Sequence, residues 1–462
     1  MFRNVKKVHF VGIGGIGMSG IAELLLNLGF NISGSDLNDS DLIQNLKSKG
    51  ADISNKHDAN NINNCEVVVY SSAVPNDNIE LKEAILKNIP IIKRAEMLGE
   101  LVALKQTSIA IGGTHGKTST SSMIGALLSK NKLDPTLIVG GLVQNLNTNS
   151  KLGGGDLIVV EADEYDKSFL QIKPTIAIIT NIEKEHMDCY DNLDDLISSF
   201  LQFANSVPFY GALIACIDSP EVQNILPLVK RHIITYGLSD KADIRAKNIK
   251  YNKEETSFLL YKNNKKMGNI KLNVPGEHNV LNSLATAAIG FEMGLNIESI
   301  IKGLKSYGGV RRRFEIKGIE NDIMVVDDYA HHPTEVTATL QAARNGWNRR
   351  IIAVFQPHLF SRTKDFYKEF AGAFMDSDVL IITDIYPARE VPIIGISSEL
   401  IYNTAKAIGH KDVHYVPQIE DIEKYLDGLV KSNDMIITIG AGTIWRYGQS
   451  YFNHLKDQRI SN

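Results

Sequence analysis

The stretch Ser108-Ile109-Ala110-Ile111 leads directly into Gly112-Gly113-Thr114-His115-Gly116-Lys117-Thr118, and a segment able to form a helix follows from Ser119 to Lys130. A buried strand, a glycine-rich turn and a helix, in that order, form a phosphate-binding loop. The glycines let backbone N–H groups point at phosphate oxygens, Lys117 neutralises charge, and Thr118 can hold Mg²⁺. We therefore predict that ATP phosphates are bound by Gly113, Thr114, His115, Gly116, Lys117, Thr118 and Ser119.

This loop is one residue shorter than the full phosphate-loop pattern. The pattern requires a glycine five residues before Gly116, and Ile111 occupies that position. An ordinary glycine turn is the alternative interpretation. The strand, loop and helix in the expected order favour phosphate binding.

Length and composition narrow the class of protein. The chain has 462 residues, which exceeds a single core, and we expect two or three domains. A hydrophobic content of 44%, a charged content of 22% and a net charge of -4 describe a soluble protein without a large basic field, so nucleic acid is not an expected partner. Cys65, Cys189 and Cys216 are scattered, which favours a reducing compartment and disfavours zinc.

The N-terminal stretch resembles a secretory signal only superficially. Arg3, Lys6 and Lys7 precede an apolar segment, but glycines interrupt that segment and Glu23 follows it. No uninterrupted apolar run approaches the roughly 18 residues that a membrane span requires. We therefore predict a cytoplasmic protein with no membrane partner.

Apolar and helix-permissive segments alternate three times along the chain, which predicts an α/β protein with parallel sheets. From Ile244 to Val274 the sequence becomes polar and partly alternating, which indicates an antiparallel hairpin or meander at a sheet edge. We expect domains at 1–105, 106–312 and 313–462. The expected strands are 8–13, 67–70, 108–111, 157–160, 176–180, 323–326, 351–355, 379–383 and 436–439, with another near 32; the expected helices include 16–28, 79–87 and 95–104.

A second glycine loop lies near the N-terminus. Gly12-Ile13-Gly14-Gly15-Ile16-Gly17 follows a strand, opens a helix and is followed by Asp36 after the next strand. This pattern predicts a site for a diphosphate with a ribose, in NAD or in a UDP-sugar, and a structural turn is the alternative. Ser71 and Ser72, after another strand, are expected at the same sheet edge. The candidate ligand-binding residues are Gly14, Gly15, Ile16, Gly17, Asp36, Ser71 and Ser72.

Possible metal ligands lie at the ends of two further strands of the central segment. Glu161 ends a buried strand and is followed by Asp163, Glu164 and Asp166, and a carboxylate beside a phosphate loop is suited to Mg²⁺. His186 follows the next buried strand. The alternatives are a solvated acidic loop and a histidine that only makes a structural hydrogen bond.

Asn279 and Asn282 lie three residues apart at a helix start, on one face. Their amides could contact a base or a phosphate site, but a helix cap would be the simpler interpretation. Arg311, Arg312 and Arg313 lie at a domain junction, where an arginine could stabilise a transferring phosphoryl group. At least one of them is expected to be merely solvated.

Polar groups are concentrated after two strands of the third segment. Asp327-Asp328-Tyr329-Ala330-His331-His332-Pro333 is a poor composition for a core, and Pro333 is well placed to open a helix. Phe355-Gln356-Pro357-His358 leads to Arg362, which could bind a carboxylate with two parallel hydrogen bonds. The candidate residues here are Asp328, Tyr329, His331, His358 and Arg362.

Together these segments resemble the Mur ligases along the whole chain. The resemblance rests on motifs in order: the glycine loop at 11–20, Ser33-Gly34-Ser35-Asp36, the loop at 113–118, Glu161-Ala162-Asp163-Glu164, Thr180-Asn181-Ile182-Glu183 with His186, His278-Asn279 with Asn282, Arg312-Arg313-Phe314, the segment 328–333, and Phe355-Gln356-Pro357-His358.

The resemblance implies two Rossmann-like terminal domains and a central ATPase domain. It implies a ligase, with ATP and Mg²⁺, that phosphorylates the carboxylate of UDP-N-acetylmuramate and joins it to L-alanine. By resemblance Lys117 contacts the phosphates, and Thr118, Glu161 and His186 hold Mg²⁺. Asn279 and Asn282 belong to the ATP site, Arg313 and Asp328 reach the nucleotide, and His331 and Arg362 face the reacting end. Lys117, His186, Arg313, His331 and Arg362 are the catalytic candidates.

Two positions depart from the family pattern. Glu185 stands where the family usually has aspartate, and its longer side chain is expected to push the carboxylate outward. Leu359 occupies a place that some members fill with arginine, so recognition of the amino-acid carboxylate would depend more on Arg362. Nothing in the sequence supports the carbamylated lysine of sister ligases.

Three alternatives stay open. A ligase that joins a whole tripeptide to the same UDP-sugar would share the ATP site, although Gly14-Gly15-Ile16-Gly17-Met18 favours the L-alanine reaction. An NAD-dependent dehydrogenase would explain the first glycine loop but not the second. A nucleotide-dependent switch would leave the polar residues at 328–332 unexplained. The sequence allows a monomer or a homodimer.

Overall fold

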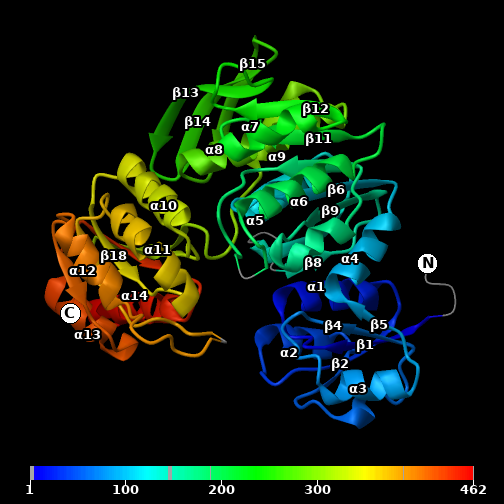
Figure 1. The fold of residues 1–462 in the computed structure, drawn as a ribbon. Coiled ribbons are helices and arrows are strands. Elements are labelled where there is room, and N and C mark those ends of the chain that lie inside the picture. Colours follow the sequence, from blue (N-terminus) through cyan, green and yellow to red (C-terminus); the bar gives the residue numbers. More distant parts are fainter. Residues whose placement is uncertain (1–4, 144–147, 188, 389, 461–462) are drawn as a thin grey trace. The chain divides into compact units, whose positions relative to one another are not determined.

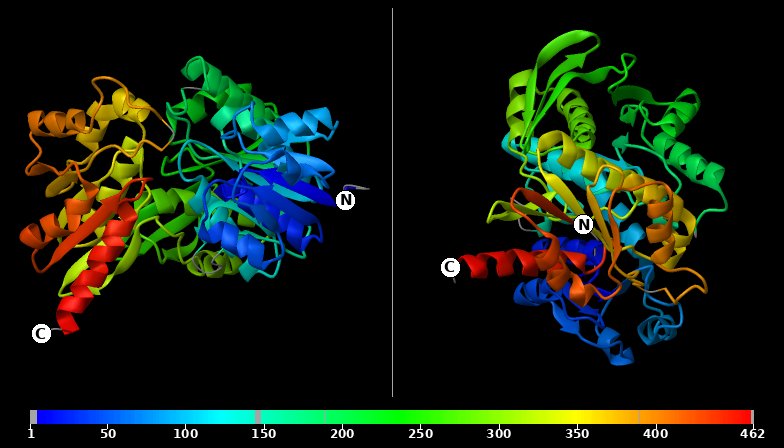
Figure 2. Two further views of the ribbon diagram at one scale, coloured as in Figure 1. Left: turned by 90° about the horizontal axis from the view of Figure 1, so that it is seen from below. Right: turned by 90° about the vertical axis from the view of Figure 1, so that its left-hand side faces the viewer.

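The computed structural model describes residues 5–143, 148–187, 189–388 and 390–460, and these form an α/β protein with three sheets covered by helices (Figure 1, Figure 2). The chain divides into two compact units. The first comprises Met1–Asn248, Phe258–Ile270 and Leu281–Gly308, and the second comprises Ile249–Ser257, Lys271–Val280 and Gly309–Asn462. The predicted fold class is confirmed.

The N-terminal sheet is parallel throughout and has the order β3-β2-β1-β4-β5. Its strands are β1 (Lys7–Val11), β2 (Asn31–Ser35), β3 (Asp52–Ser54), β4 (Val67–Tyr70) and β5 (Ile91–Lys93). Its helices are α1 (Ile16–Asn27), α2 (Asp41–Ser48), α3 (Ile79–Leu86) and α4 (Arg94–Ala103). The strand order reverses between β1 and β4, so the loops after these two strands flank the crevice where such sheets bind ligands.

The central sheet has ten strands in the order β15-β14-β13-β12-β11-β10-β6-β9-β7-β8. The parallel strand β6 (Thr107–Gly112) lies between β9 (Leu157–Glu161) and β10 (Ile176–Ile179), so the loops after these three strands share one edge. The other strands are β7 (Thr136–Val143), β8 (Thr148–Lys151), β11 (Ala212–Cys216), β12 (His232–Gly237), β13 (Ile244–Asn252), β14 (Glu255–Lys262) and β15 (Lys265–Leu272). The last three are joined by two-residue turns at the end of the sheet, which confirms the predicted meander.

The described part of the central segment has the α-helices α5 (Lys117–Lys130), α6 (Leu193–Asn205), α7 (Pro220–Ile225), α8 (Glu277–Glu292) and α9 (Ile297–Lys305). Helix α5 begins at the residue after Gly116 and is buried over most of its length. Strands β10 and β11 are buried at every residue. The continuous apolar run at 176–180 predicted β10 correctly, because both faces of the sheet are covered, whereas β11 was not among the predicted strands.

The C-terminal sheet has the order β16-β17-β21-β18-β19-β20, with only the edge strand β16 antiparallel. Its strands are β16 (Glu315–Glu320), β17 (Ile323–Asp328), β18 (Arg350–Phe355), β19 (Val379–Ile382), β20 (Val413–Tyr415) and β21 (Asp434–Ile439). Its helices are α10 (Pro333–Gly346), α11 (Phe360–Ala373), α12 (Glu399–Ala407), α13 (Ile422–Leu429) and α14 (Ile444–Ile460). Within the described ranges, every helix is too short or too polar to span a bilayer.

Candidate functional site

The loop after β6 has backbone conformations that only glycine adopts easily. Gly113 has φ +132° and Gly116, directly before α5, has φ +83°. A β-carbon at Gly113 would overlap the Thr180 hydroxyl. Gly113 therefore serves both the turn and the close approach of the segment after β10, and Gly116 serves the turn beside Asn282.

Residues directly after β10 fix the loop by hydrogen bonds. The backbone N–H of His115 donates to Asn181 Oδ1 at 2.8 Å, and the Thr180 hydroxyl donates to the carbonyl of His115 at 2.6 Å. The Thr114 N–H donates to the carbonyl of Asn181 at 3.1 Å. These bonds fix the loop without using the side chain of Lys117.

The ammonium of Lys117 lies inside the loop. Its Nζ lies 2.7 and 2.9 Å from the two carboxylate oxygens of Glu164, and it also donates to the carbonyls of Gly113 at 2.6 Å and Thr114 at 3.1 Å. Burial lowers the pKa of Lys117, but the neighbouring carboxylates of Glu164 and Asp163 outweigh burial and raise it. Lys117 is therefore cationic and preorganised. Its partner Glu164 is a site residue, which the sequence identified only as one of three acids that follow Glu161.

Glu161, at the end of β9, lies beside the start of α5. Its carboxylate accepts hydrogen bonds from the hydroxyls of Thr118 at 3.1 Å and Ser121 at 3.2 Å, and from the N–H of Gly140 at 2.6 Å. Burial raises its pKa. The structure thus brings together the predicted metal ligands Thr118 and Glu161.

His186 lies beside a different carboxylate. Its Nε2 is 3.9 Å from Glu164 Oε1, and its ring packs edge-to-face on Tyr165 at 5.2 Å. Donor atoms of Asp163, Glu164 and His186 all lie within 4.8 Å of one another, a grouping able to hold a cation. The solvated-loop interpretation is wrong for Glu164, whose side chain is 1% exposed.

Glu185 does not point outward. The residue is only 6% exposed, contrary to the expectation from its longer side chain, and its charge helps to raise the pKa of Lys117. A buried carboxylate near a buried ammonium is stabilised by that charge. Glu185 therefore belongs to the electrostatic surroundings of the loop.

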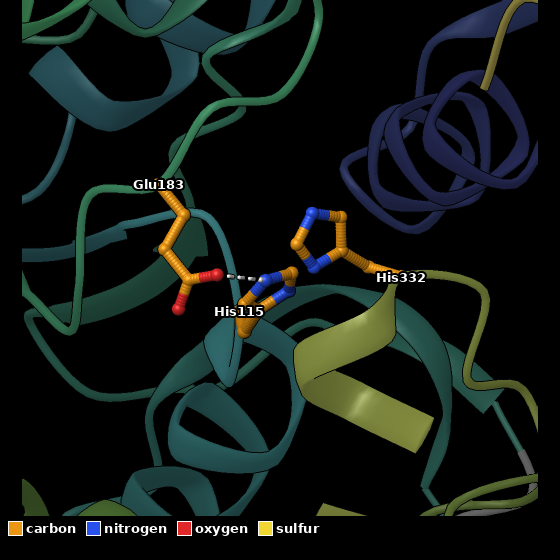
Figure 3. A group of neighbouring side chains, drawn as sticks. All are labelled: His115, Glu183 and His332. Atoms are coloured by element: carbon orange, nitrogen blue, oxygen red, sulfur yellow. Dashed lines mark ion pairs between the residues drawn. The ribbon is translucent and has the colours of Figure 1, made fainter. Parts of the chain in front are cut away.

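His115 forms an ion pair at the same edge. Its Nε2 is 3.5 Å from Glu183 Oε2, a contact drawn as the dashed line in Figure 3. The Glu183 N–H also donates to the Thr114 hydroxyl at 2.8 Å. Both contacts tie the middle of the loop to the segment after β10.

The two asparagines of α8 have different surroundings. Asn282 Oδ1 accepts from the Thr120 hydroxyl at 3.1 Å and lies 2.8 Å from the position of a β-carbon on Gly116, so it is packed against the loop. Asn279 Nδ2 donates to the carbonyl of Pro275 at 2.7 Å. Both lie inside the helix, which begins at Glu277, so the helix-cap interpretation is wrong.

The first glycine loop is held by an acid. The Gly14 N–H donates to Asp36 Oδ2 at 2.8 Å, and Asp36 Oδ1 accepts from the Asn38 N–H at 3.0 Å. Val11 at the end of β1 pairs with Tyr70 at the end of β4, so Ser71 and Ser72 directly follow the neighbouring strand. The Ser71 N–H donates to the carbonyl of Val11. Gly14, Gly15, Ile16, Gly17, Asp36, Ser71 and Ser72 thus lie at one sheet edge, as predicted.

Arg94 connects this loop to the acidic segment after β9. Its Nη2 lies 3.3 Å from Asp163 Oδ2, and its Nη1 lies 2.6 Å from where a β-carbon on Gly17 would be. Asn149 Nδ2 donates to the carbonyl of Ile16 at 2.7 Å. Sequence reasoning missed Arg94, because its partner is 69 residues away.

The carboxylate of Asp328, at the end of β17, is fixed by hydrogen bonds from backbone N–H groups. Its carboxylate accepts from the N–H groups of Phe314 at 2.7 Å and Ala330 at 2.8 Å, and burial raises its pKa to about 6. Arg312 lies 3.1 Å from Asp327 Oδ2 and donates to the carbonyl of Gly440, so it is structural. Arg313 lies 3.4 Å from Glu335.

The fold brings together the remaining C-terminal candidates. The rings of Tyr329 and His331 are 5.2 Å apart, and those of His331 and His358 are 6.2 Å apart. Arg362 Nη1 lies 3.2 Å from His358 Nδ1, and Tyr386 stacks on His358 at 5.8 Å. Since arginine only donates, His358 Nδ1 is the acceptor in this contact. Tyr386 is a further site residue without a motif in the sequence.

Leu359, at the start of α11, has φ +73° and provides no cap for the helix. The Ser361 N–H donates instead to Glu390 at 3.0 Å, so a carboxylate from another loop caps the helix that contains Arg362.

Comparisons with known proteins cover nearly the whole chain. Residues 7–106 match the model of the Mur ligase family, catalytic domain; residues 111–290 match the Mur ligase middle domain; and residues 312–442 match the Mur ligase, glutamate ligase domain. The UDP-N-acetylmuramate--L-alanine ligase of Geotalea uraniireducens is 49% identical over 99% of both chains. The protein of the same name from Geobacter sp. strain M21 is 47% identical over 100% of both chains.

Solved structures agree with these matches. A UDP-N-acetylmuramate-alanine ligase from Thermotoga maritima superposes with a TM-score of 0.84 at 29% identity, covering 98% of this chain and 99% of that one. A murein peptide ligase from Psychrobacter arcticus has a TM-score of 0.71 at 24% identity, covering 97% of this chain and 98% of that one, which shows a common fold.

Proposed function

The chain belongs to the Mur ligase family, and we propose that it is an ATP-dependent ligase that joins the carboxylate of UDP-N-acetylmuramate to L-alanine in peptidoglycan precursor synthesis. The observation with most weight is identity near 48% to relatives of that name over 99% of the chain. The murein peptide ligase is the second candidate, and its 24% identity supports only the fold.

The chemistry requires activation of a carboxylate. A carboxylate is a poor electrophile for an amine, so transfer of the γ-phosphoryl group of ATP creates an acyl phosphate with a good leaving group. The amine then forms the C–N bond as the C–O bond to phosphate breaks. Positive charge must therefore gather where phosphoryl oxygens develop charge.

Residues of the second glycine loop are suited to ATP. Lys117 is a fixed cation, and the backbone of Gly113 to Ser119 lies at a helix N-terminus, which favours phosphate oxygens. Asn282 supports the loop, and Asn279 is proposed for the same nucleotide site. Arg313 and Asp328 are proposed to contact the nucleotide from the C-terminal domain.

Thr118 and Glu161 are suited to Mg²⁺ because a buried carboxylate and a hydroxyl already face each other there, whereas His186, proposed as the third ligand, lies beside Glu164. Asp163 and Glu164 are additional donors near His186. Bound Mg²⁺ would offset the negative charge of the phosphates.

We assign the UDP-sugar to residues 1–105 and ATP to residues 106–312. The backbone at Gly14 to Gly17 would accept the diphosphate, with Asp36, Ser71 and Ser72 around the nucleoside. Residues 313–462 would bind the amino acid, with Tyr329, His331, His358 and Arg362 at the reacting end. A cytoplasmic location fits the cytoplasmic origin of such substrates, and a monomer or homodimer is proposed.

Phosphate release tests this function. We expect release only when ATP, UDP-N-acetylmuramate and L-alanine are all present, with the amide product detected by mass spectrometry. Release that is indifferent to the sugar nucleotide would contradict a ligase. Oxidation of NADH would support the dehydrogenase, and activity only with a tripeptide would support the second candidate.

A further inference from the structure

Glu335, in the first turn of α10, contacts two candidate catalytic residues at once. Its Oε2 accepts from the backbone N–H of His331 at 3.0 Å and lies 3.3 Å from His331 Nδ1. Its Oε1 lies 3.4 Å from Arg313 Nη1. The carboxylate is 12% exposed, so little solvent screens these contacts.

The contacts of His331 determine its tautomer. Nδ1 lies 3.0 Å from the carbonyl oxygen of Tyr329 and 3.3 Å from Glu335 Oε2. Both neighbours only accept, so Nδ1 must have the hydrogen. In the neutral ring the lone pair is then on Nε2, and the carboxylate would stabilise the ring if Nε2 took up a proton.

Helix capping alone does not account for this arrangement. Glu335 is three residues after the N-cap His332, the position from which a glutamate accepts the N–H of the cap residue. Glu335 accepts the N–H of His331 instead. Its contacts with Arg313 and with His331 Nδ1 add nothing to the capping of α10.

We propose that Glu335 is a positioning residue that holds Arg313 and His331 for amide formation; this inference rests on the proposed function. Arg313 supplies positive charge to the transferred phosphoryl group. His331 Nε2 takes one proton from the ammonium of the amino acid, which leaves a neutral amine. That amine displaces phosphate from the acyl carbon, and its second proton leaves with the phosphate.

Substitution of Glu335 provides the test. Glu335→Ala removes every contact, and Glu335→Gln leaves one oxygen for His331 while its NH2 faces the N–H of Arg313. We expect kcat with L-alanine to fall about 10-fold to 100-fold in Glu335→Ala and less in Glu335→Gln, with KM for the UDP-sugar unchanged. The control is Glu399→Gln, because Glu399 is an exposed acid in the first turn of α12. It should retain wild-type activity.

Hydroxylamine as the nucleophile distinguishes an effect of Glu335 on His331 from a general loss of stability. It is uncharged at neutral pH and attacks the acyl phosphate without a proton acceptor, so Glu335→Ala should form the hydroxamate with a smaller loss than the amide. Equal losses with both nucleophiles would contradict the action of Glu335 through His331 and leave only its contact with Arg313 in acyl-phosphate formation. Thermal melting of each variant checks folding, and Glu335→Gln serves if Glu335→Ala is unfolded.

A double-mutant cycle completes the test. If Glu335 acts through His331, Glu335→Ala should cost much less in a His331→Ala background than in the wild type. Additive losses would contradict the action of Glu335 through His331, and a loss no larger than that of Glu399→Gln would overturn the whole inference. The wild-type enzyme keeps the two hypotheses apart: its inactivity with L-alanine would refute the proposed function, whereas an active wild type beside an equally active Glu335→Ala would refute only the role of Glu335.

Discussion

The two glycine loops follow the same order of strand, turn and helix, yet their turns are held in opposite ways. Asp36 fixes the first loop by accepting the N–H of Gly14 at 2.8 Å. In the second loop the ammonium of Lys117 lies within the turn, between two carbonyls and the carboxylate of Glu164. The first loop is thus stabilised by the carboxylate of Asp36, and the second contains the ammonium of Lys117.

This difference matches the chemistry proposed for each loop. A diphosphate that is only bound can be held by backbone N–H groups at a helix N-terminus. A γ-phosphoryl group that is transferred develops charge in the transition state, and a cation fixed beforehand stabilises that charge. The two loops are therefore expected to fail separately when they are altered.

The largest expected effect is that of Lys117→Ala. Turnover should fall by at least about 10³-fold, because the cation beside the phosphoryl group is lost. Affinity for UDP-N-acetylmuramate, measured by calorimetry, should stay close to the wild-type value. Lys130→Ala, an exposed lysine at the end of the same helix, is the matched control.

Loss of Lys117 also leaves Glu164 buried without its partner, which costs about 3–5 kcal/mol of stability. Lys117→Ala combined with Glu164→Gln should recover melting temperature but not turnover. Equal loss of ATP and UDP-sugar binding in the single variant would show that the two sites are not separate.

A pair of glycine substitutions compares the loops directly. Gly113→Ala should abolish ATP binding and lower stability by more than about 1–3 kcal/mol, because φ is +132° and the new carbon would overlap the Thr180 hydroxyl. Gly15 has φ -63° and no neighbour nearer than 3.7 Å to its added carbon. Gly15→Ala should therefore melt within about 1 kcal/mol of wild type and weaken only UDP-sugar binding. A reversed order of stability would refute this comparison.

Asp36→Asn should have a smaller effect. Asparagine retains one oxygen, so either Gly14 or Asn38 loses its acceptor, at a cost of about 1 kcal/mol or more. KM for the UDP-sugar should rise roughly fivefold to tenfold while KM for ATP is unchanged. A rise in KM for ATP alone would place Asp36 with the wrong ligand.

Acid should affect the loops at different pH values. In the first turn of α3, the ion pair with His9 and hydrogen bonds from Ser35 and Asn61 outweigh burial and lower the pKa of Glu80 to about 2. Its unfolded value is near 4.5, so its stabilising contribution is present above pH 4.5 and is lost as the pH falls towards 2. Burial raises the pKa of Glu161, which therefore gains a proton at higher pH.

On acidification from pH 8 to 4, KM for Mg²⁺ and ATP should therefore rise while UDP-sugar affinity stays constant, because the pKa of Glu80 is about 2. Parallel titrations of both affinities between pH 8 and 4 provide the measurement. Simultaneous loss of the two affinities would contradict this difference between the loops.

The local sequence pattern was sufficient to predict the strands and the glycine turns, but not the side chains that contact one another in the folded protein. Strands such as β10 are continuous apolar runs, and glycines mark the turns that need unusual φ. Glu164 lies 47 residues from Lys117, and which acid reaches the ammonium depends on how β6 and β9 pair. Glu335 was missed because a glutamate in a first helical turn is typical of capping.

In the proposed reaction the sugar carboxylate attacks the γ-phosphorus of ATP. UDP-N-acetylmuramate labelled with ¹⁸O in its lactyl carboxylate tests this most directly, with the released phosphate analysed by mass spectrometry after one round of amide formation with L-alanine. Each released phosphate should contain one ¹⁸O from the labelled carboxylate. Unlabelled phosphate, formed together with the amide, would contradict it.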